Sequence, residues 1–323
     1  MQKIFITGIT GQDGLFLTSK LLNKKVSIYG STRQSSTKNF YNKLAKINNL
    51  SGAEVKLINL DLLNYQTVET FLNDVKPDKI FNLTGPSSVY KSITDNQESY
   101  NQIINIFDNL TTSVLKNRLK TVIFQASSSE MFEKNKEGIY DESSKLSAST
   151  PYAEAKIHNH LKSVELSSKY NLNIYSGIMF NHESEFRAND YLIMQVIAAA
   201  EKIACGKLNQ FSIGSLDLVR DWSFAGDIVD AMIKISDNGK FNSYVIGSGQ
   251  GASISYVIKL VFEYFNLDFN EFIKVDKNLN RKNNNKKIIS NPTRIKNELN
   301  WQTTLSLDEL IVRCIEKRPI NLE

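Results

Sequence analysis

Short apolar runs alternate with longer amphipathic stretches through the first half of the chain. The short runs have the length of β-strands, and the stretches between them place apolar residues at helical spacing. The predicted strands are Lys3–Thr7, Val26–Ser31, Val55–Asn59, Lys79–Leu83, Thr121–Ala126 and Asn173–Gly177. Strands that alternate with helices predict an α/β fold built on a Rossmann-like, doubly wound parallel sheet.

Beyond Phe180 this alternation weakens and the predicted elements become more mixed. They are a helix at Tyr191–Ala204, a strand near Gln210–Ile213, a helix at Ala225–Ser236, a strand at Ser243–Ile246 and two late helices. We therefore expect two interleaved parts. Residues 1–178, with a returning segment around 214–248, form the sheet domain, and residues 179–323 form mainly a smaller C-terminal lobe.

A glycine-rich turn follows the first predicted strand. Gly8 allows a tight turn, Gly11 lets the backbone approach a pyrophosphate, and Gly14 lets the next helix pack closely on the strand. The spacing is GxxGxxG rather than GxGxxG, and such runs also occur as ordinary turns. Its place in a strand–helix–strand unit favours a dinucleotide site. The candidate cofactor-binding residues of this turn are Gly8, Thr10, Gly11, Gln12, Asp13 and Gly14.

Two pairs of chemically useful residues lie further along the chain. Tyr152 and Lys156 are four residues apart, so they share one face of a helix, where the ammonium can favour the ionised phenol and make it a base. Ser128 and Glu130 follow a strand that ends in FQAS, although Glu130 alone could be a helix cap or a surface carboxylate. Ligands bind beyond the carboxyl ends of parallel strands, so these residues and the glycine turn are expected to meet in one crevice.

Composition narrows the class of protein. The chain has 323 residues, a formal net charge of +5, and the apolar and charged fractions of a globular protein. No basic stripe indicates nucleic acid, and no apolar run reaches the roughly 18 residues that a membrane helix requires. The N-terminus enters a strand at once, so we expect no signal peptide and a cytoplasmic protein without nucleic-acid or membrane partners.

The cysteines and histidines give no indication of a metal site. Cys205 and Cys314 are far apart and lie in apolar helical patterns, so we expect two packing residues rather than a disulfide or a metal cluster. The histidines His158, His160 and His182 lack metal-ligand spacing with these cysteines. We therefore expect no bound metal.

The motifs ITGITGQDG, FQASSSEMF, PYAEAK, FNHES and RDW together resemble the extended short-chain dehydrogenases/reductases that act on nucleotide sugars. The resemblance is closest to the GDP-mannose 4,6-dehydratase family, and it runs from Ile6 into the segment at residues 291–310. It implies an NAD(P)-binding Rossmann domain, a sugar-nucleotide lobe, and a homodimer or homotetramer. It also implies a catalytic quartet that falls on Ser128, Glu130, Tyr152 and Lys156.

The reaction that this resemblance implies is internally redox-neutral. Tyr152 would remove the proton of the sugar C4 hydroxyl while hydride leaves C4, with Ser128 hydrogen-bonded to the same oxygen. The new ketone acidifies C5, where Glu130 would take the proton, and the C6 hydroxyl then leaves as water. Hydride returns to C6 and a proton to C5, so the cofactor ends oxidised.

Cofactor choice depends on the end of the second predicted strand. Arg33 stands where a cation would accommodate a ribose 2′-phosphate, which favours NADP over NAD, although a solvated arginine is the alternative there. Asp61 resembles the family aspartate near the adenine ring. The other candidate cofactor-binding residues are Leu62, Leu83 and Gly85.

Candidate substrate-binding residues are more scattered. Arg220 resembles the arginine that meets the nucleotide diphosphate, with a salt bridge to Asp221 as the alternative. Arg281 lies in a basic segment that could equally be a solvated loop. The full set of candidates is Ser87, Asn181, Arg187, Arg220 and Arg281.

The chain departs from the family pattern near the expected sugar site. The usual AQSHV reads GPSSV at residues 85–89, and a basic-glycine-acidic stretch after FNHES reads EFRAND at residues 185–190. A GDP-heptose or another NDP-hexose therefore competes with GDP-mannose as substrate. A 4-epimerase or 4-keto reductase, which would not need Glu130, is the enzymatic alternative, and a cofactor-sensing binding protein is the non-enzymatic one.

Overall fold

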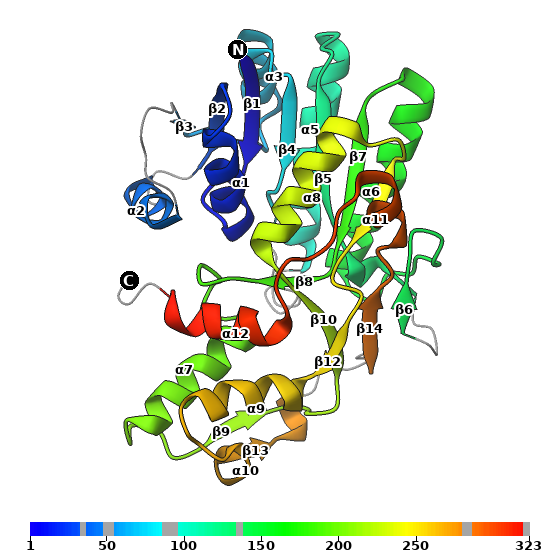
Figure 1. The fold of residues 1–323 in the computed structure, drawn as a ribbon. Coiled ribbons are helices and arrows are strands. Elements are labelled where there is room, and N and C mark those ends of the chain that lie inside the picture. Colours follow the sequence, from blue (N-terminus) through cyan, green and yellow to red (C-terminus); the bar gives the residue numbers. More distant parts are fainter. Residues whose placement is uncertain (33–36, 48–54, 86–95, 134–137, 280–285, 319–323) are drawn as a thin grey trace.

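The computed structural model describes residues 1–32, 37–47, 55–85, 96–133, 138–279 and 286–318. Its centre is a sheet of seven parallel strands in the order β11-β7-β5-β4-β1-β2-β3 (Figure 1). The strands are β1 (Gln2–Thr7), β2 (Val26–Ser31), β3 (Val55–Ile58), β4 (Lys79–Asn82), β5 (Val122–Ser128), β7 (Ile174–Met179) and β11 (Ser243–Ile246). All six strands predicted in the first half of the chain are present, which confirms the α/β class and the doubly wound parallel sheet.

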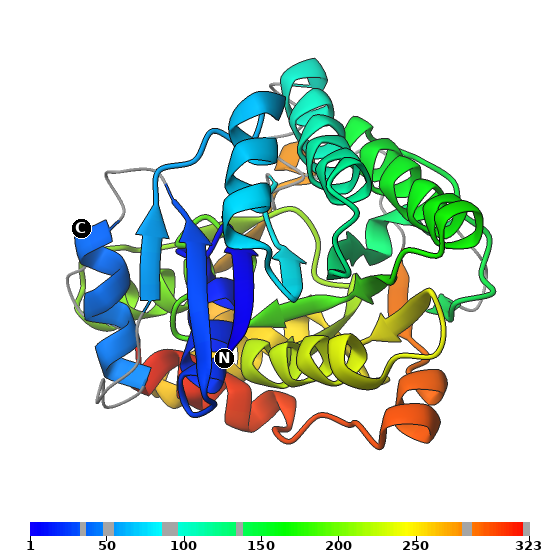
Figure 2. The same cartoon turned by 90° about the horizontal axis from the view of Figure 1, so that it is seen from above.

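Helices cover both faces of this sheet, as the view from above shows (Figure 2). One face carries α3 (Tyr65–Val75), α5 (Asn96–Lys116) and α6 (Pro151–Tyr170), and the other carries α1 (Gln12–Leu22) and α8 (Ala225–Asn238), with α2 (Thr37–Ile47) beside α1. Strand β1 shows how the sequence specifies both layers. Ile4 and Ile6 pack in the same cluster as α1 and α8, whereas Phe5 packs with α3 and α5, because successive strand side chains point to opposite faces.

A smaller sheet lies beyond the carboxyl ends of the large one. Strand β10 (Val219–Phe224) is its centre and pairs with β8 (Asn181–Glu183), β12 (Gly251–Ser253) and β14 (Lys287–Ser290), and β14 pairs in turn with β6 (Ile139–Tyr140). Our strand predictions did not include any of these five segments. They are two to six residues long. Segments of this length are too short for the alternation of apolar and polar residues that marks a strand to be distinguished from the sequence of an ordinary loop.

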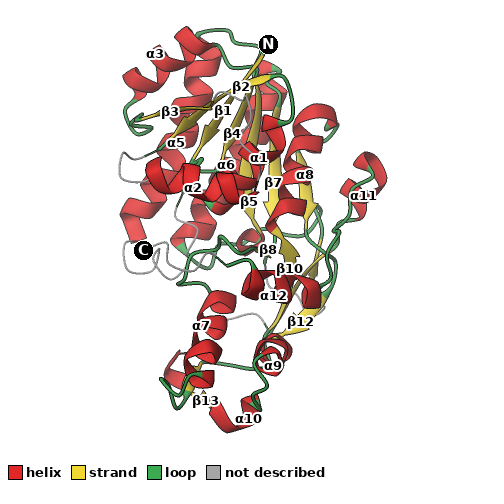
Figure 3. Ribbon diagram, turned by 60° about the vertical axis from the view of Figure 1, so that its left-hand side comes forward, coloured by secondary structure: helices red, strands yellow, loops and turns green. Residues whose placement is uncertain are grey.

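The rest of the C-terminal half forms a helical layer at the far end of the molecule (Figure 3). Its core packs α7, α9 and α12 against one another, with Val196, Val257 and Leu310 fully or almost fully buried. The elements of this layer are α7 (Leu192–Ala204), β9 (Phe211–Ile213), α9 (Ile254–Tyr264), α10 (Phe269–Phe272), β13 (Ile273–Val275) and α12 (Leu307–Glu316), with a 3₁₀ turn at Lys277–Leu279. Helix α11 (Thr293–Leu299) instead contacts β11 and α8 of the sheet domain, and a second 3₁₀ turn, Ser129–Met131, follows β5.

The two cysteines differ in environment. Cys314 of α12 is buried, and burial raises the pKa of its thiol well above the usual value. Cys205 is exposed, so the prediction that it packs in the interior is wrong, because α7 ends at Ala204 and the next residue forms its C-cap. Among the described helices, none has the length and apolar character needed to cross a membrane.

Candidate active site

The glycine turn joins β1 to α1 in the tight form that the sequence predicts. Gly8 has φ +66°, a left-handed conformation that favours glycine, and its amide donates to the Ser31 hydroxyl at 3.3 Å. A Cβ on Gly14 would lie 2.4 Å from the Ile9 carbonyl oxygen, so only glycine fits there. Gly11 caps α1 without a side-chain hydrogen bond, which leaves the amides of the helix N-terminus open to an anion.

The carboxyl ends of β1, β4 and β5 are tied together by side chains. Thr7 donates its hydroxyl to Asn82 at 2.8 Å, and the Asn82 amide donates to Gln125 at 2.7 Å. The Thr7 oxygen also accepts the amide of Leu83 at 3.1 Å. The strand order reverses between β1 and β4, which is where ligands bind in such sheets. Leu83 and Thr84, which follow β4 and precede Gly85, therefore lie beside Gly8 of the glycine turn.

Asp61 and Leu62 follow β3, and their side chains lie in different environments. The Asp61 carboxylate accepts the Leu63 amide at 3.0 Å, and the residue remains exposed. The Leu62 side chain packs into the core beside Val68 and Leu72, so only its backbone can face a ligand.

The four candidate catalytic residues are brought together at the end of β5. Ser128 is the last residue of β5, and its hydroxyl accepts the Glu130 amide at 3.3 Å, so Ser128 rather than Glu130 caps the 3₁₀ turn. The Ser128 hydroxyl also interacts with the Tyr152 phenol and lowers the pKa of the phenol. Lys156 donates to the Ala126 carbonyl at 2.9 Å, and its Nζ lies 5.6 Å from the centroid of the Tyr152 ring.

Tyr152 and Lys156 lie near the start of α6, and the N-cap of this helix fixes where it begins. The Thr150 hydroxyl accepts the Ala153 amide at 3.1 Å, and Pro151 occupies the first helical turn, where its missing N–H costs nothing. The helix therefore starts just before Tyr152, and its first two turns present Tyr152 and Lys156 on one face toward β5.

Burial controls the protonation of this group. Burial raises the pKa of Tyr152 to about 12, and the negative charge of Glu130 raises it too, whereas the Ser128 hydroxyl lowers it. Burial lowers the pKa of Lys156 to about 8. In the protein alone, desolvation disfavours the phenolate more than the neighbouring groups favour it. That Lys156 helps to make the phenol a base in the complete site stays a prediction.

Gln12 and Asp13 direct their side chains to β8 rather than into the turn. Gln12 donates to the His182 carbonyl at 3.2 Å and accepts the Ser184 hydroxyl at 2.7 Å. The Asp13 carboxylate lies 3.1 Å from His182 Nε2, and His182 Nδ1 lies 2.8 Å from the Phe180 carbonyl. Only the backbones of Gln12 and Asp13 therefore remain in the turn for a cofactor.

The Asp13–His182 pair is buried and charged. Burial alone would raise the pKa of Asp13, but the charge of His182 and its hydrogen bond lower it. Burial alone would lower the pKa of His182, but Asp13 raises it, so the pair favours a carboxylate with an imidazolium. Sequence reasoning missed this pair, because its members are 169 residues apart.

Arg187 lies in the segment between β8 and α7. Its Nε is 3.2 Å from a carboxylate oxygen of Glu183, and its Cζ is 3.5 Å from the centroid of the Tyr191 ring. Asn181 is exposed at the start of β8, two residues beyond Met179, which is the register partner of Ser128. Glu183 and Tyr191 were not predicted as site residues. No local pattern marks them, although Glu183 belongs to the FNHES motif.

The remaining substrate-binding candidates are less closely placed. Arg220 lies in β10 opposite Ala252 and Ile288, and its guanidinium donates to the Val219 carbonyl at 2.8 Å. The Asp221 carboxylate accepts hydrogen bonds from Ser248, Gly249 and Ser290. Arg33, Ser87 and Arg281 lie outside the described residues.

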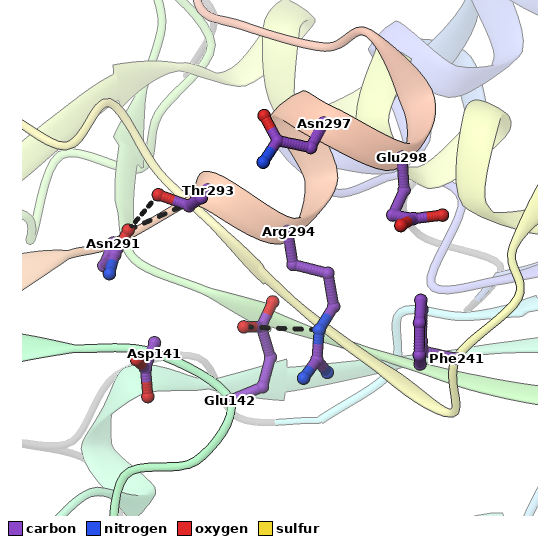
Figure 4. Close-up of a pocket in the computed structure, with 8 residues that line it drawn as sticks. All are labelled: Asp141, Glu142, Phe241, Asn291, Thr293, Arg294, Asn297 and Glu298. Carbon is purple, nitrogen blue, oxygen red and sulfur yellow. Dashed lines mark hydrogen bonds and ion pairs between the residues drawn. The ribbon is translucent and has the colours of Figure 1, made fainter.

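A cavity of about 370 Å³ lies along the edge strand β11 (Figure 4). Arg294 projects into it, with its Nε 3.6 Å from Glu142 and its Cζ 4.9 Å from the centroid of the Phe241 ring. The predicted site residues do not line this cavity. Within the described parts of the chain, no group of three or more histidine, cysteine or acidic residues is arranged to hold a metal ion.

Known sequences place the chain among nucleotide-sugar enzymes. A family profile described as GDP-mannose 4,6 dehydratase matches residues 5–314. The GDP-mannose 4,6 dehydratase of Homo sapiens is 30% identical over 335 residues, which cover 95% of this chain and 88% of the human protein. GDP-mannose 4,6 dehydratase 2 of Arabidopsis thaliana is 27% identical over 319 residues, which cover 97% and 85% of the two chains.

Solved structures share the fold over nearly the whole chain. UDP-glucose 4-epimerase from Thermotoga maritima superposes with a TM-score of 0.85 at 19% identity, covering 98% of both chains. The dTDP-glucose 4,6-dehydratase DesIV from Streptomyces venezuelae, solved with NAD bound, gives 0.84 at 17% identity and covers 98% of this chain and 96% of its own. RMD from Pseudomonas aeruginosa, solved with NADPH, gives 0.79 at 17% identity and covers 98% of both.

Proposed function

The chain belongs to the GDP-mannose 4,6-dehydratase family, and we propose that it converts GDP-mannose, or a closely related nucleotide sugar, into the 4-keto-6-deoxy sugar. The observation that carries this proposal is the position of Glu130. Its charge acts on the Tyr152 phenol, and its backbone amide is bound by Ser128. A carboxylate next to the base that takes the proton of the C4 hydroxyl is what removal of the C5 proton requires.

Each residue of the quartet has a chemical task in this reaction. Tyr152 takes the proton of the C4 hydroxyl while Ser128 hydrogen-bonds the same oxygen. Glu130 then takes the C5 proton, which the 4-ketone has acidified, and passes it to the departing C6 hydroxyl, which leaves as water. Lys156, held by the Ala126 carbonyl, keeps a cation near the phenol. General acid–base steps of this kind typically contribute about 10²–10⁴-fold each.

The glycine turn fits the pyrophosphate of a nicotinamide cofactor. Gly11 has no side chain to obstruct the N-terminus of α1, and the helix amides there lack a side-chain cap. When bound, an oxidised nicotinamide would supply the acceptor for the C4 hydride and the donor of hydride to C6, and its positive charge would favour the Tyr152 phenolate. The residues that would hold it are Gly8, Thr10, Gly11, Gln12, Asp13 and Gly14, with Arg33, Asp61, Leu62, Leu83 and Gly85.

The proposed substrate site lies between the quartet and the smaller sheet. Asn181 follows the register partner of Ser128, and Arg187 lies in the segment that follows β8. Ser87, Arg220 and Arg281 complete the proposed set. We infer that residues 1–178 mainly bind the cofactor and residues 179–323 the sugar nucleotide, in a cytoplasmic homodimer or homotetramer.

The experiment that tests this function is mass spectrometry of the purified protein with oxidised cofactor and a panel of nucleotide sugars headed by GDP-mannose. We expect loss of one water from GDP-mannose. Water loss only from another sugar, such as a GDP-heptose, would keep the dehydratase reaction and show a different substrate. The altered segment at residues 85–89 would then be the candidate cause of the changed specificity. A change of stereochemistry or stoichiometric cofactor consumption without water loss would replace the dehydratase by an epimerase or reductase.

We propose NADP as the cofactor in preference to NAD. The support is Arg33, since an arginine after β2 can hold a 2′-phosphate through charged hydrogen bonds. We expect R33A to weaken NADP binding about 10- to 100-fold and to leave NAD binding unchanged, since a hydrogen bond to a charged group is worth about 1.5–3 kcal/mol. Fluorescence titration of both cofactors measures this, with R118A, an exposed arginine before β5, as the control. Equal affinities in the parent protein would refute NADP preference.

A further inference from the structure

An acidic residue occupies the first turn of α1, where the glycine turn would hold the cofactor diphosphate. The residue is Asp13, and the negative charge of its carboxylate would oppose the binding of an anion at this helix N-terminus. We propose that His182 of β8 is a positioning residue of the cofactor site, whose imidazolium directs the Asp13 carboxylate away from the glycine turn and neutralises it. The inference rests on the cofactor site of the proposed function and is independent of the dehydration chemistry.

The two hydrogen-bond partners of the His182 ring require its charged form. Nε2 lies 3.1 Å from a carboxylate oxygen of Asp13, and Nδ1 lies 2.8 Å from the carbonyl oxygen of Phe180. A carboxylate and a carbonyl only accept hydrogen bonds, so a neutral imidazole, with one N–H, would lose one of these two contacts. The geometry therefore fits an imidazolium that donates to both partners.

Burial makes Asp13 and His182 depend on each other for their charge balance. Only 11% of the His182 side chain and 19% of the Asp13 side chain are exposed, so water screens neither charge well. Burial raises the pKa of Asp13, but the charge and hydrogen bond of His182 lower it. Burial lowers the pKa of His182, but Asp13 raises it. Loss of the imidazolium would therefore leave an uncompensated carboxylate beside the cofactor diphosphate.

A second set of contacts fixes the segment that carries His182 against α1. Gln12, next to Asp13 in sequence, donates to the His182 carbonyl at 3.2 Å and accepts the Ser184 hydroxyl at 2.7 Å. The Ser184 oxygen accepts the Phe186 amide at 3.1 Å. The imidazolium is therefore held in one place relative to the helix N-terminus, and little further ordering is needed when an anion binds there.

Arg187 and Glu183 are the other charged groups that act on this pair. Arg187 lowers the pKa of both Asp13 and His182, although burial and the pairing of these two groups have larger effects. Its Nε lies 3.2 Å from Glu183 Oε2, but the two buried atoms do not form a hydrogen bond. Because Glu183 and Arg187 carry opposite charges side by side, they offset each other and do not replace His182.

The elements packed on β8 supply no competing charge to His182 within the described residues. Its register neighbour in β10 is Ser223, which is uncharged. Helix α8 also contacts β8 and has Asp227 in its first turn, but this carboxylate accepts the amide and the hydroxyl of Thr304, at 2.8 Å and 2.7 Å. His182 is therefore the cation that is hydrogen-bonded to Asp13 in the described part of the chain.

The sign of the pH effect follows from the raised pKa of His182. A group of this kind is fully protonated below its ordinary pKa and loses its proton as pH rises through the raised value. Two unit charges roughly 6–12 Å apart, at an effective dielectric constant of about 20, repel enough to weaken binding about 10- to 100-fold. We therefore expect cofactor affinity to be constant at low pH and to fall by this factor as His182 becomes neutral.

The test is fluorescence titration of NADP and NAD between about pH 6 and pH 9, the range in which a histidine with a raised pKa ionises. At neutral pH, H182Q should bind both cofactors about 10- to 100-fold more weakly than the parent protein. The double variant D13N/H182Q removes both charges and should recover most of the affinity. Its pH dependence should be smaller than that of the parent, with any remainder due to Lys156, whose pKa is about 8.

The double variant distinguishes a charge effect from a structural one. If His182 only anchored β8 to α1, removal of both partners would weaken binding as much as H182Q does, and that result would overturn the inference. H158Q is the matched control, because His158 Nδ1 also lies beside a side-chain oxygen, that of Asn159 at 3.4 Å, but in α6 on the opposite face of the sheet. It should bind cofactor as the parent protein does.

A second measurement needs neither H182Q nor bound cofactor. The chain has three histidines, so NMR of the imidazole ring nitrogens, with H158Q and H160Q for assignment, identifies the His182 signals. We expect protons on both ring nitrogens of His182 at neutral pH, and a neutral ring there would overturn the inference. Cofactor binding with the expected pH dependence, but without loss of water from any sugar, would refute the proposed dehydratase and leave the inference standing.

Discussion

Replacement of Glu130 by glutamine is expected to stop loss of water while sparing hydride removal from C4. The amide keeps the size of the side chain, and the Ser128 hydroxyl still accepts the backbone amide of residue 130. What disappears is the acceptor for the C5 proton, so dehydration should fall by about 10²–10⁴-fold. Reduced cofactor should therefore accumulate, together with a 4-keto sugar that still carries its C6 hydroxyl.

Stopped-flow absorbance of the reduced nicotinamide, with mass spectrometry of the quenched sugar, measures both halves of this result. E133Q is the matched control, because Glu133 lies three residues further on and pairs with Lys145 at 3.0 Å on the surface. It should behave as the parent protein does. Full turnover in E130Q would exclude the dehydratase mechanism and favour an epimerase or reductase on the same fold.

Y152F should block the reaction one step earlier. Without the phenol the C4 proton has no acceptor, so neither reduced cofactor nor dehydrated product should form, and kcat should fall by about 10²–10⁴-fold or more. The fold should survive, because the ring stays packed with Ile103 and Ala155, and the lost polar interaction with Ser128 is worth about 1 kcal/mol.

Y244F is the control that separates the effect of Y152F on turnover from its effect on thermal stability. Tyr244 is fully buried in β11, and its hydroxyl accepts the Lys240 amide at 2.8 Å and the Phe241 amide at 3.3 Å, so its loss also removes hydrogen bonding from a buried tyrosine. Thermal unfolding should shift by similar amounts in the two variants, while only Y152F loses turnover in a coupled assay. Reduction of the cofactor by Y152F at the parent rate would remove Tyr152 from the mechanism.

The sequence predicted the large sheet well because its strands carry short apolar runs, and the central ones, such as β4, are buried on both faces. The smaller sheet was missed because strands such as β6 and β8 span two and three residues and gain their pairing from segments distant in sequence. Cys205 was wrongly assigned to the interior for a related reason. Apolar periodicity continues past Ala204, and a helix end cannot be located from periodicity alone.

In the candidate site, too, residues close in sequence were predicted together and residues distant in sequence were not. Tyr152 with Lys156, and Ser128 with Glu130, are close in sequence, so a helical or turn spacing was enough to group them. The pairing of Asp13 with His182 joins residues from opposite halves of the chain, which only the fold brings together. The protonation of Tyr152 could not be predicted from spacing, because burial dominates it and burial depends on the whole crevice.

At the β11 edge of the large sheet, two side chains occupy backbone groups that a further strand would need. Glu142 accepts the outward-facing Val245 amide at 2.7 Å, and Arg294 donates to the Ser243 carbonyl at 3.0 Å. Unpaired edge strands recruit strands from other molecules and lead to aggregation. The Glu142–Arg294 pair therefore keeps β11 from pairing with strands of other copies of the chain, which reduces aggregation at high protein concentration.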